Sequence, residues 1–210
     1  MSATPSDSTP PDQVPADTTP SGSTQWGSVD SAKYDSKWAD LEASGQNAHG
    51  EADLVSRFSP ASVLDAGCGS GRVAIELARR GCHVVGVDLD EPFINAARAK
   101  APELDFRLDD LATVQLDQSF DVVVMAGNVM IFVAPGTEQA VVSNMAAHLN
   151  PGGRLIAGFQ LNHNLAIEDY RRAAQVAGLE IEEHWSTWDG DVFAANSDYA
   201  VFVHRSPVES

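Results

Sequence analysis

Short apolar runs alternate with amphipathic helical patterns along most of this chain. The runs are of strand length and rich in Val, Ile and Leu, and most are separated by segments whose apolar residues recur at helical spacing. The runs predict strands over 61–66, 83–87, 104–108, 120–126, 154–159, 179–187 and 199–205. The helical patterns predict helices over 30–44, 48–57, 71–80, 91–100, 137–149 and 166–177. This alternation predicts an α/β fold, a mostly parallel sheet with helices on both faces.

Two segments indicate how the sheet is arranged. Residues 120–126 form the most apolar run of the chain, so we expect this strand at the sheet centre, buried on both faces. Only residues 188–198 separate the last two strands, and they show no helical repeat. A parallel connection needs a crossover of a dozen or more residues, so the last strand should run antiparallel. The prediction is a doubly wound three-layer sandwich.

The first 25 residues differ in composition from the rest. They contain five prolines among Ser, Thr and Asp, and almost no large apolar side chains. Such a segment cannot bury enough surface to offset the entropy of ordering it. We therefore expect a disordered tail over 1–25, one domain over 26–206 and a flexible end over 207–210.

Charge and composition exclude several classes of partner. The chain has 30 acidic against 13 basic residues, a net charge of −17, and its dense basic pairs lie within predicted helices. Nucleic acids and anionic membranes require clustered Lys and Arg, so neither is expected as a partner. No apolar stretch approaches the roughly 20 residues that span a bilayer, and the N-terminus lacks the features of a signal peptide. We expect a cytoplasmic protein with Cys68 and Cys82 as free thiols.

A glycine-rich loop follows the first predicted strand. The loop reads Asp65-Ala-Gly-Cys-Gly-Ser-Gly71 and leads into a helical pattern, and 21 residues after Gly67 the next strand ends in Asp88. Glycines let a backbone approach a ligand closely, because no Cβ stands in the way. An acid at the end of the following strand is suited to ribose hydroxyls. The pattern therefore predicts a ligand that contains adenosine.

With Asp109, Phe120-Asp121 and the turn Pro151-Gly152-Gly153 added in order, the chain resembles the class I S-adenosylmethionine-dependent methyltransferases over about residues 30–205. The resemblance implies a Rossmann-like, seven-stranded sheet with an antiparallel last strand. It implies S-adenosyl-L-methionine as the cofactor and S-adenosyl-L-homocysteine as the product.

The resemblance places the methionine half of the cofactor at the glycine loop. The backbone at Gly67, Gly69 and Gly71 would pass close to this half. Asp65 would orient the loop and, through water, the amino group of the cofactor. Asp88 would accept hydrogen bonds from both ribose hydroxyls, which suits a carboxylate with two oxygens. Each aspartate has an alternative role as a helix cap or turn residue.

The resemblance also places the adenine and the reactive methyl. Leu89 would pack on the adenine face, and Asp109 would meet the adenine amino group. Asp110 could take the role of Asp109 instead, because the predicted position of this strand end can shift by one residue. Beside the methyl group would lie the residues that end the fourth strand: Ala126, Gly127 and Asn128.

The sequence identifies catalytic residues only weakly, because a sulfonium is already a good leaving group and needs mainly alignment, water exclusion and sometimes a base. The candidates are Tyr34, His49, Asn128 and His163. Each histidine has a surface or capping role as its alternative. Trp185 and Trp188 could line an acceptor pocket or serve in packing. We find no carboxylate cluster for a metal and expect none.

The acceptor is expected to be a small molecule methylated at O, N, S or C. After the fourth strand the chain reads Gly127-Asn128-Val129-Met130, without the Asn/Asp-Pro-Pro-aromatic sequence of methyltransferases that act on nucleobase or Gln amino groups. Two alternatives remain. One is a cofactor-binding but inactive regulatory protein. The other is a dinucleotide-dependent oxidoreductase, which the Gly-x-Gly-x-Gly spacing and Arg72 disfavour. A monomer or homodimer is expected.

Overall fold

The computed structural model describes residues 36, 38, 40, 43–45 and 47–208. The expected tail over 1–25, Tyr34 and most of the helix predicted over 30–44 lie outside the described residues. Within them, no helix is both long enough and apolar enough to cross a membrane.

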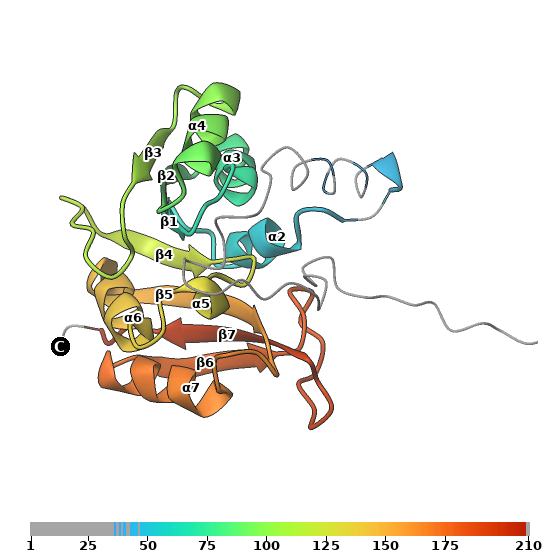
Figure 1. Cartoon of the computed structure of the whole chain (residues 1–210), viewed down its shortest axis with the longest axis vertical. Helices are drawn as coiled ribbons and strands as arrows, with labels where there is room; N and C mark the ends of the chain where they lie inside the picture. Colours follow the sequence, from blue (N-terminus) through green and yellow to red (C-terminus); the bar gives the residue numbers. More distant parts are fainter. Residues whose placement is uncertain (1–35, 37, 39, 41–42, 46, 209–210) are drawn as a thin grey trace, which may run out of the picture.

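The described chain folds around a seven-stranded sheet of order β3-β2-β1-β4-β5-β7-β6 (Figure 1). The strands are β1 (Ser62–Ala66), β2 (His83–Asp88), β3 (Asp105–Leu108), β4 (Phe120–Met125), β5 (Leu149–Gln160), β6 (Glu180–Trp185) and β7 (Tyr199–Arg205). Strand β7 pairs antiparallel with both β5 and β6, and the remaining pairs are parallel. The predicted fold class, the antiparallel last strand and the central position of β4 are confirmed.

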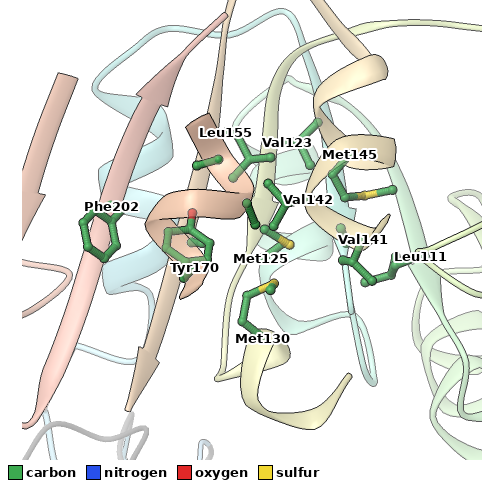
Figure 2. Close-up of a cluster of buried hydrophobic side chains, with 14 of the residues drawn as sticks. Leu111, Val123, Met125, Met130, Val141, Val142, Met145, Leu155, Tyr170 and Phe202 are labelled. Carbon is green, nitrogen blue, oxygen red and sulfur yellow. The ribbon is translucent and has the colours of Figure 1, made fainter. Parts of the chain in front are cut away.

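Helices cover both faces of the sheet and enclose a hydrophobic cluster on each. Three helices pack on one face: α2 (Gly50–Ser56), α3 (Arg72–Arg79) and α4 (Glu91–Lys100). Three pack on the other: α5 (Val129–Phe132), α6 (Glu138–Ala147) and α7 (Ile167–Val176). Figure 2 shows this second cluster, in which Met125 and Leu155 of the sheet meet Val142 and Tyr170 of the helices. The sequence did not predict α5, because four residues are too few to show a helical period.

Strand β5 begins earlier than predicted. It starts at Leu149 rather than at residue 154, and the expected Pro151-Gly152-Gly153 turn is an irregular section inside the strand. Phe120 pairs with Leu149 and Val122 with Arg154, so two steps along β4 match five along β5. A Cβ on Gly153 would lie 2.9 Å from the Asn150 carbonyl oxygen and 3.0 Å from that of Asp121. The glycine therefore allows this bulge to form against β4.

The strand order determines where a ligand can bind. From β1 the chain moves outward through β2 to β3, and then returns to place β4 on the other side of β1. The connections on the two sides of this point leave in opposite directions, which opens a crevice at the carboxyl ends of β1 and β4. The glycine loop follows β1 directly, so it lies in this crevice.

A buried histidine stands out in the second hydrophobic cluster. His204 of β7 is fully buried, and its Nδ1 lies 3.4 Å from the hydroxyl oxygen of Tyr170. Burial, together with nearby His184 and Arg171, lowers the pKa of His204 to about 4. This imidazole is thus neutral in the folded protein, where its charged form would be poorly solvated.

We expect His204 to make stability depend on pH. The unfolded chain, with a histidine pKa near 6.5, binds this proton more tightly than the folded chain does. Stability should therefore fall as the pH drops from about 6.5 to 4, by about 3 kcal/mol from this group. Urea unfolding across this range should show a shallower loss for His204→Phe than for the wild type. Exposed His163→Ala serves as the control, and equal slopes in all three proteins would contradict the assignment.

Candidate functional site

The glycine loop is held in a left-handed conformation at the end of β1. Gly67, Gly69 and Gly71 have φ angles of 80°, 52° and 86°, which L side chains rarely adopt. The backbone N–H groups of Gly67 and Cys68 both donate to the carbonyl oxygen of Val87, at 2.8 and 3.0 Å. The loop is therefore fixed to the end of β2 as well as to β1.

Two buried aspartates accept backbone hydrogen bonds in and around this loop. The Oδ2 of Asp65 accepts a hydrogen bond from the N–H of Ala74 at 2.9 Å, and so caps α3, whose N-cap residue is a glycine without a side chain. The Oδ2 of Asp88 accepts from the N–H of Gly69 at 2.8 Å, and its Oδ1 accepts from the N–H of Asp90 at 2.9 Å. Both carboxylates thus shape the backbone around them.

Burial changes the acidity of these groups. It raises the pKa of Asp65 to about 7, although nearby Arg72 opposes the shift. Burial also raises the pKa of Asp88. The thiol of Cys68, in the same loop, has a pKa well above its ordinary value for the same reason, so it stays protonated and is a poor nucleophile. A cation placed beside Asp65 would favour its ionised form.

A cavity opens above these carboxylates, at the carboxyl ends of β1, β2 and β4. It runs from the glycine loop past the loop after β3 to α5 and the start of α6. Seven of the predicted cofactor residues line it: Asp65, Gly67, Gly69, Asp88, Leu89, Asp110 and Ala126. The topology thus brings together residues that are far apart in the sequence.

A comparison with known proteins identifies the family of this chain. A family profile described as a methyltransferase domain matches residues 63–153. The crystal structure of a TehB-like SAM-dependent methyltransferase from Corynebacterium glutamicum is 35% identical, covers 83% of this chain and 96% of its own, and has a TM-score of 0.77. The chain belongs to the S-adenosylmethionine-dependent methyltransferases. Its cofactor is therefore S-adenosylmethionine.

Further relatives belong to the same class of enzyme. The magnesium protoporphyrin IX methyltransferase of Synechocystis, solved with bound SAM, is 25% identical, with a TM-score of 0.58 over 84% of this chain and 79% of its own. The ubiquinone biosynthesis O-methyltransferase of Xylella fastidiosa is 34% identical over 122 residues, which is 54% of this chain and 48% of the relative. The chain thus spans less than half of this curated relative.

Three predicted cofactor residues of the methyltransferase do not line the cavity. A Cβ on Gly71 would lie 2.9 Å from the Phe106 ring, so this glycine makes room for packing. The Oδ1 of exposed Asp109 accepts from the N–H of Asp110 at 2.8 Å, a turn contact. The Oδ1 of buried Asn128 accepts from the N–H of Gln160 at 2.7 Å, which ties the ends of β4 and β5 together. Asp109 and Asp110 were the two candidates for the adenine contact, and of these it is Asp110 that lines the cavity.

Sequence reasoning missed most of the far wall of the cavity. This wall contains Leu111 together with residues from α5 through the first turns of α6: Val129, Phe132, Val133, Ala134, Thr137 and Val141. Val129 lies directly over the loop, because a Cβ on Gly67 would come within 2.4 Å of its Cγ2. The available signal was the apolar run Val-Met-Ile-Phe-Val at 129–133, which is too short to identify as an element.

The other catalytic candidates of the methyltransferase lie away from the cavity or outside the described residues. Tyr34 is outside them. His49 is the half-buried N-cap residue of α2, and His163 is exposed on the loop after β5. The indole N–H of Trp188 donates to the hydroxyl of Tyr199 at 3.2 Å, and neither Trp185 nor Trp188 lines the cavity. Among described residues, no group of three His, Cys, Asp or Glu side chains could hold a metal ion.

The raised pKa of Asp65 leads to a prediction on stability without cofactor. The folded chain holds this proton up to about pH 7 and the unfolded chain only to about 3.8, so the stabilising contribution is lost as the pH rises through this window. Asp65→Asn keeps an oxygen for the N–H of Ala74. It should be more stable than wild type at pH 8, with the difference vanishing near pH 4, in urea unfolding at both pH values. Asp117→Asn, an exposed change, is the control. A wild type that keeps its advantage at pH 8 would refute the raised pKa.

Proposed function

We propose that this methyltransferase transfers a methyl group from S-adenosylmethionine to a small-molecule acceptor by in-line displacement. The observation that carries the proposal is the continuous cavity from Asp65 through Asp88 to Asp110, with acids at one side and an apolar wall at the other. Such a cavity suits a ligand that contains a charged amino acid, a ribose and an aromatic base.

The cavity residues fit the parts of the cofactor in order. Asp88 keeps lone pairs on its oxygens after its backbone contacts with Gly69, Asp90 and Leu89, so it can accept the ribose hydroxyls. Leu89, a residue that is 57% exposed and lines the cavity, would pack on one face of the adenine. Asp110 would accept from the adenine amino group, and Asp65 would face the ammonium group of the methionine moiety. The three aspartates would thus place polar groups where the cofactor has complementary ones.

The protein contributes mainly alignment to such a reaction. When bound, S-adenosylmethionine supplies an electrophilic methyl group and leaves as S-adenosylhomocysteine. The residues at the end of β4, Ala126 and Gly127, have little or no side chain and line the cavity, so they leave room for an approaching acceptor. The glycine loop, fixed by Asp88 and by the Val87 carbonyl, holds the cofactor side still. Holding two reactants in line and excluding water supplies much of the rate.

The size of the acceptor is inferred from charge and from relatives. The net charge of −17 is unfavourable for nucleic acid. The names of the curated relatives differ in the acceptor: one is named for magnesium protoporphyrin, one for ubiquinone biosynthesis, one for ribosomal protein L11 and one for the N-terminus of cypemycin. The net charge and the magnesium-protoporphyrin relative support a small molecule as the acceptor.

Calorimetric titration tests the cofactor half of the proposal. S-adenosylmethionine and S-adenosylhomocysteine should bind, and NADH should not. Asp88→Ala should weaken both ligands by at least about tenfold, because a charge-assisted hydrogen bond contributes about 1.5–3 kcal/mol. Asp117→Ala, at an exposed turn, should bind as the wild type does. Unchanged affinity in a folded Asp88→Ala would remove this residue from the ribose site.

An acceptor screen tests the reaction itself. We expect S-adenosylhomocysteine to form with at least one member of a panel of phenols, amines, thiols and carboxylic acids. With that acceptor, a chiral methyl group should be transferred with inversion, as in-line displacement requires. Cofactor binding without turnover on any panel member would favour an inactive regulatory protein, and retention of configuration would exclude a single in-line step.

A further inference from the structure

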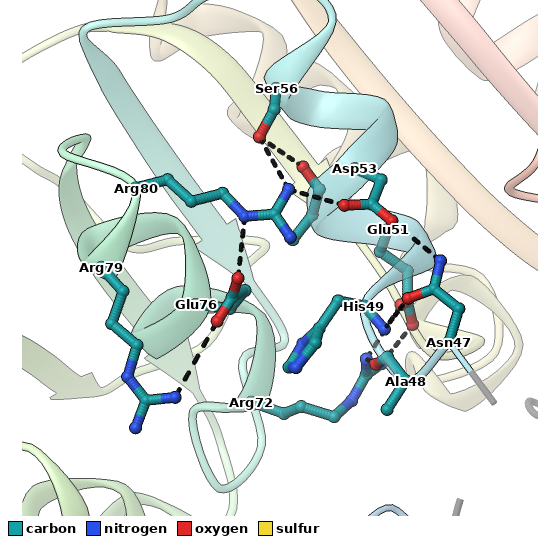
Figure 3. A network of polar contacts seen from close by, with 11 residues as sticks. Asn47, Ala48, His49, Glu51, Asp53, Ser56, Arg72, Glu76, Arg79 and Arg80 are labelled. Atoms are coloured by element: carbon teal, nitrogen blue, oxygen red, sulfur yellow. Dashed lines mark hydrogen bonds and ion pairs between the residues drawn. The ribbon is translucent and has the colours of Figure 1, made fainter. Parts of the chain in front are cut away.

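Different polar networks hold the two sides of the cavity in the methyltransferase. Beside the glycine loop, the guanidinium of Arg72 donates to Glu51 and to the backbone of the segment before β1 (Figure 3). At the far wall, the side chains of Asn144 and His148, at the end of α6, bind the loop after β3, residues 110–116. This second network lies beside Asp110, the residue proposed to meet the adenine.

One face of α6 both lines the cavity and contacts this loop. Thr137, Val141, Asn144 and His148 follow one another at intervals of four, three and four residues, so they lie along one side of the helix. Thr137 and Val141, at its beginning, line the cavity. Asn144 and His148, at its end, reach the loop. The same helix therefore borders the cavity and holds the loop beside it.

Three hydrogen bonds join α6 to the loop. The Nδ2 of Asn144 donates to the carbonyl oxygens of Leu111 and Val114, both at 2.9 Å, and so uses both of its N–H groups. The Nε2 of buried His148 accepts from the N–H of Leu116 at 3.2 Å, and its Nδ1 lies 2.8 Å from the carbonyl oxygen of Asn144. An imidazole with its proton on Nδ1 satisfies both of these contacts. The loop is thus bound to the helix at three successive points.

The loop is a compact turn that carries the carboxylate of Asp110. The carbonyl oxygen of Asp110 accepts from the N–H groups of Thr113 and Val114 at 3.0 and 2.8 Å, and its Oδ1 accepts from the N–H of Ala112 at 2.8 Å. Among the described residues no donor binds Oδ2, so this oxygen is available to a ligand. Because the carboxylate is bound into the turn, its position follows that of the turn, which α6 holds in place.

We propose that Asn144 and His148 are positioning residues that set the preference of the cavity for adenine, by fixing the carboxylate of Asp110 opposite the amino group of the base. This inference rests on the proposed function, which places Asp110 at that amino group. A turn that α6 already holds costs little entropy to order when the ligand binds. A base with a carbonyl in place of the amino group would bring its oxygen against the carboxylate, and a fixed carboxylate cannot move away from it.

The test compares S-adenosylhomocysteine with S-inosylhomocysteine, in which a carbonyl group replaces the amino group of the adenine. Calorimetry should show that wild type binds the adenine compound about 10- to 100-fold more tightly, because with the other compound the carboxylate loses a donor and meets an acceptor. In Asn144→Ala this ratio should fall to within about threefold, mainly through weaker binding of the adenine compound. His148→Phe, which keeps an aromatic ring but removes the acceptor for Leu116, should lower the ratio less.

The matched control is Asn150→Ala. The Nδ2 of Asn150 donates to the Oδ1 of Asp121 at 2.9 Å, near the amino end of β4, and neither residue lines the cavity. This variant loses an amide hydrogen bond of the same kind, so it should keep the wild-type ratio.

An unchanged ratio in a folded Asn144→Ala, or affinities for both compounds that fall in parallel, would overturn the inference and leave Asn144 with a structural role. If Asn144→Ala does not fold, His148→Phe decides, and a wild-type ratio in that variant would overturn the inference in the same way. If wild type binds both compounds equally, the proposed contact of Asp110 with the adenine fails, and this inference with it. If wild type binds neither compound, it is the proposed function as a whole that fails.

Discussion

The hydrogen bond from the N–H of Gly69 to the carboxylate of Asp88 is the contact on which the site depends. At 2.8 Å it ties the middle of the glycine loop to the end of the neighbouring strand, and the carbonyl of Val87 holds the two preceding N–H groups. The loop therefore has one conformation, with its left-handed glycines in register with β2. Gly69 and Asp88 both line the cavity, so this link joins two parts of its lining, while Asp65 caps α3 beside it.

Burying two carboxylates in this site costs free energy. Asp65 and Asp88 are buried, and burial opposes their ionisation. Each offsets part of that cost with backbone contacts, Asp65 by capping a helix that begins with a glycine and Asp88 by receiving two N–H groups. A cationic group in the cavity would offset more. Sites of this kind are less stable empty than occupied, since any ligand that binds only the folded state stabilises it.

The sequence predicted the fold well because its signals were local. Alternating runs identified all seven strands, and the length of the 188–198 segment identified the antiparallel one. What it missed depends on contacts between distant segments. Gly71 and Gly86 both make room for the ring of Phe106, and Asn128 binds the end of β5. The far wall of the cavity comes from residues 129–141, and the contacts that hold Arg72 appear only when Trp38, Ala48 and Glu51 are brought against it.

The same distinction explains why the cofactor could be predicted and the acceptor could not. The cofactor contacts that we propose are with backbone and strand-end acids, which a short motif specifies. An acceptor would meet side chains from several segments, and here these are already engaged with one another. Trp188, from the loop after β6, packs where a Cβ of Gly158 would otherwise lie and donates to Tyr199, while Gly50 at the start of α2 faces its Cβ. The segment before β1 therefore contacts Arg72, which lines the cavity, through Ala48 and Glu51, and it contacts the β6–β7 loop through Gly50.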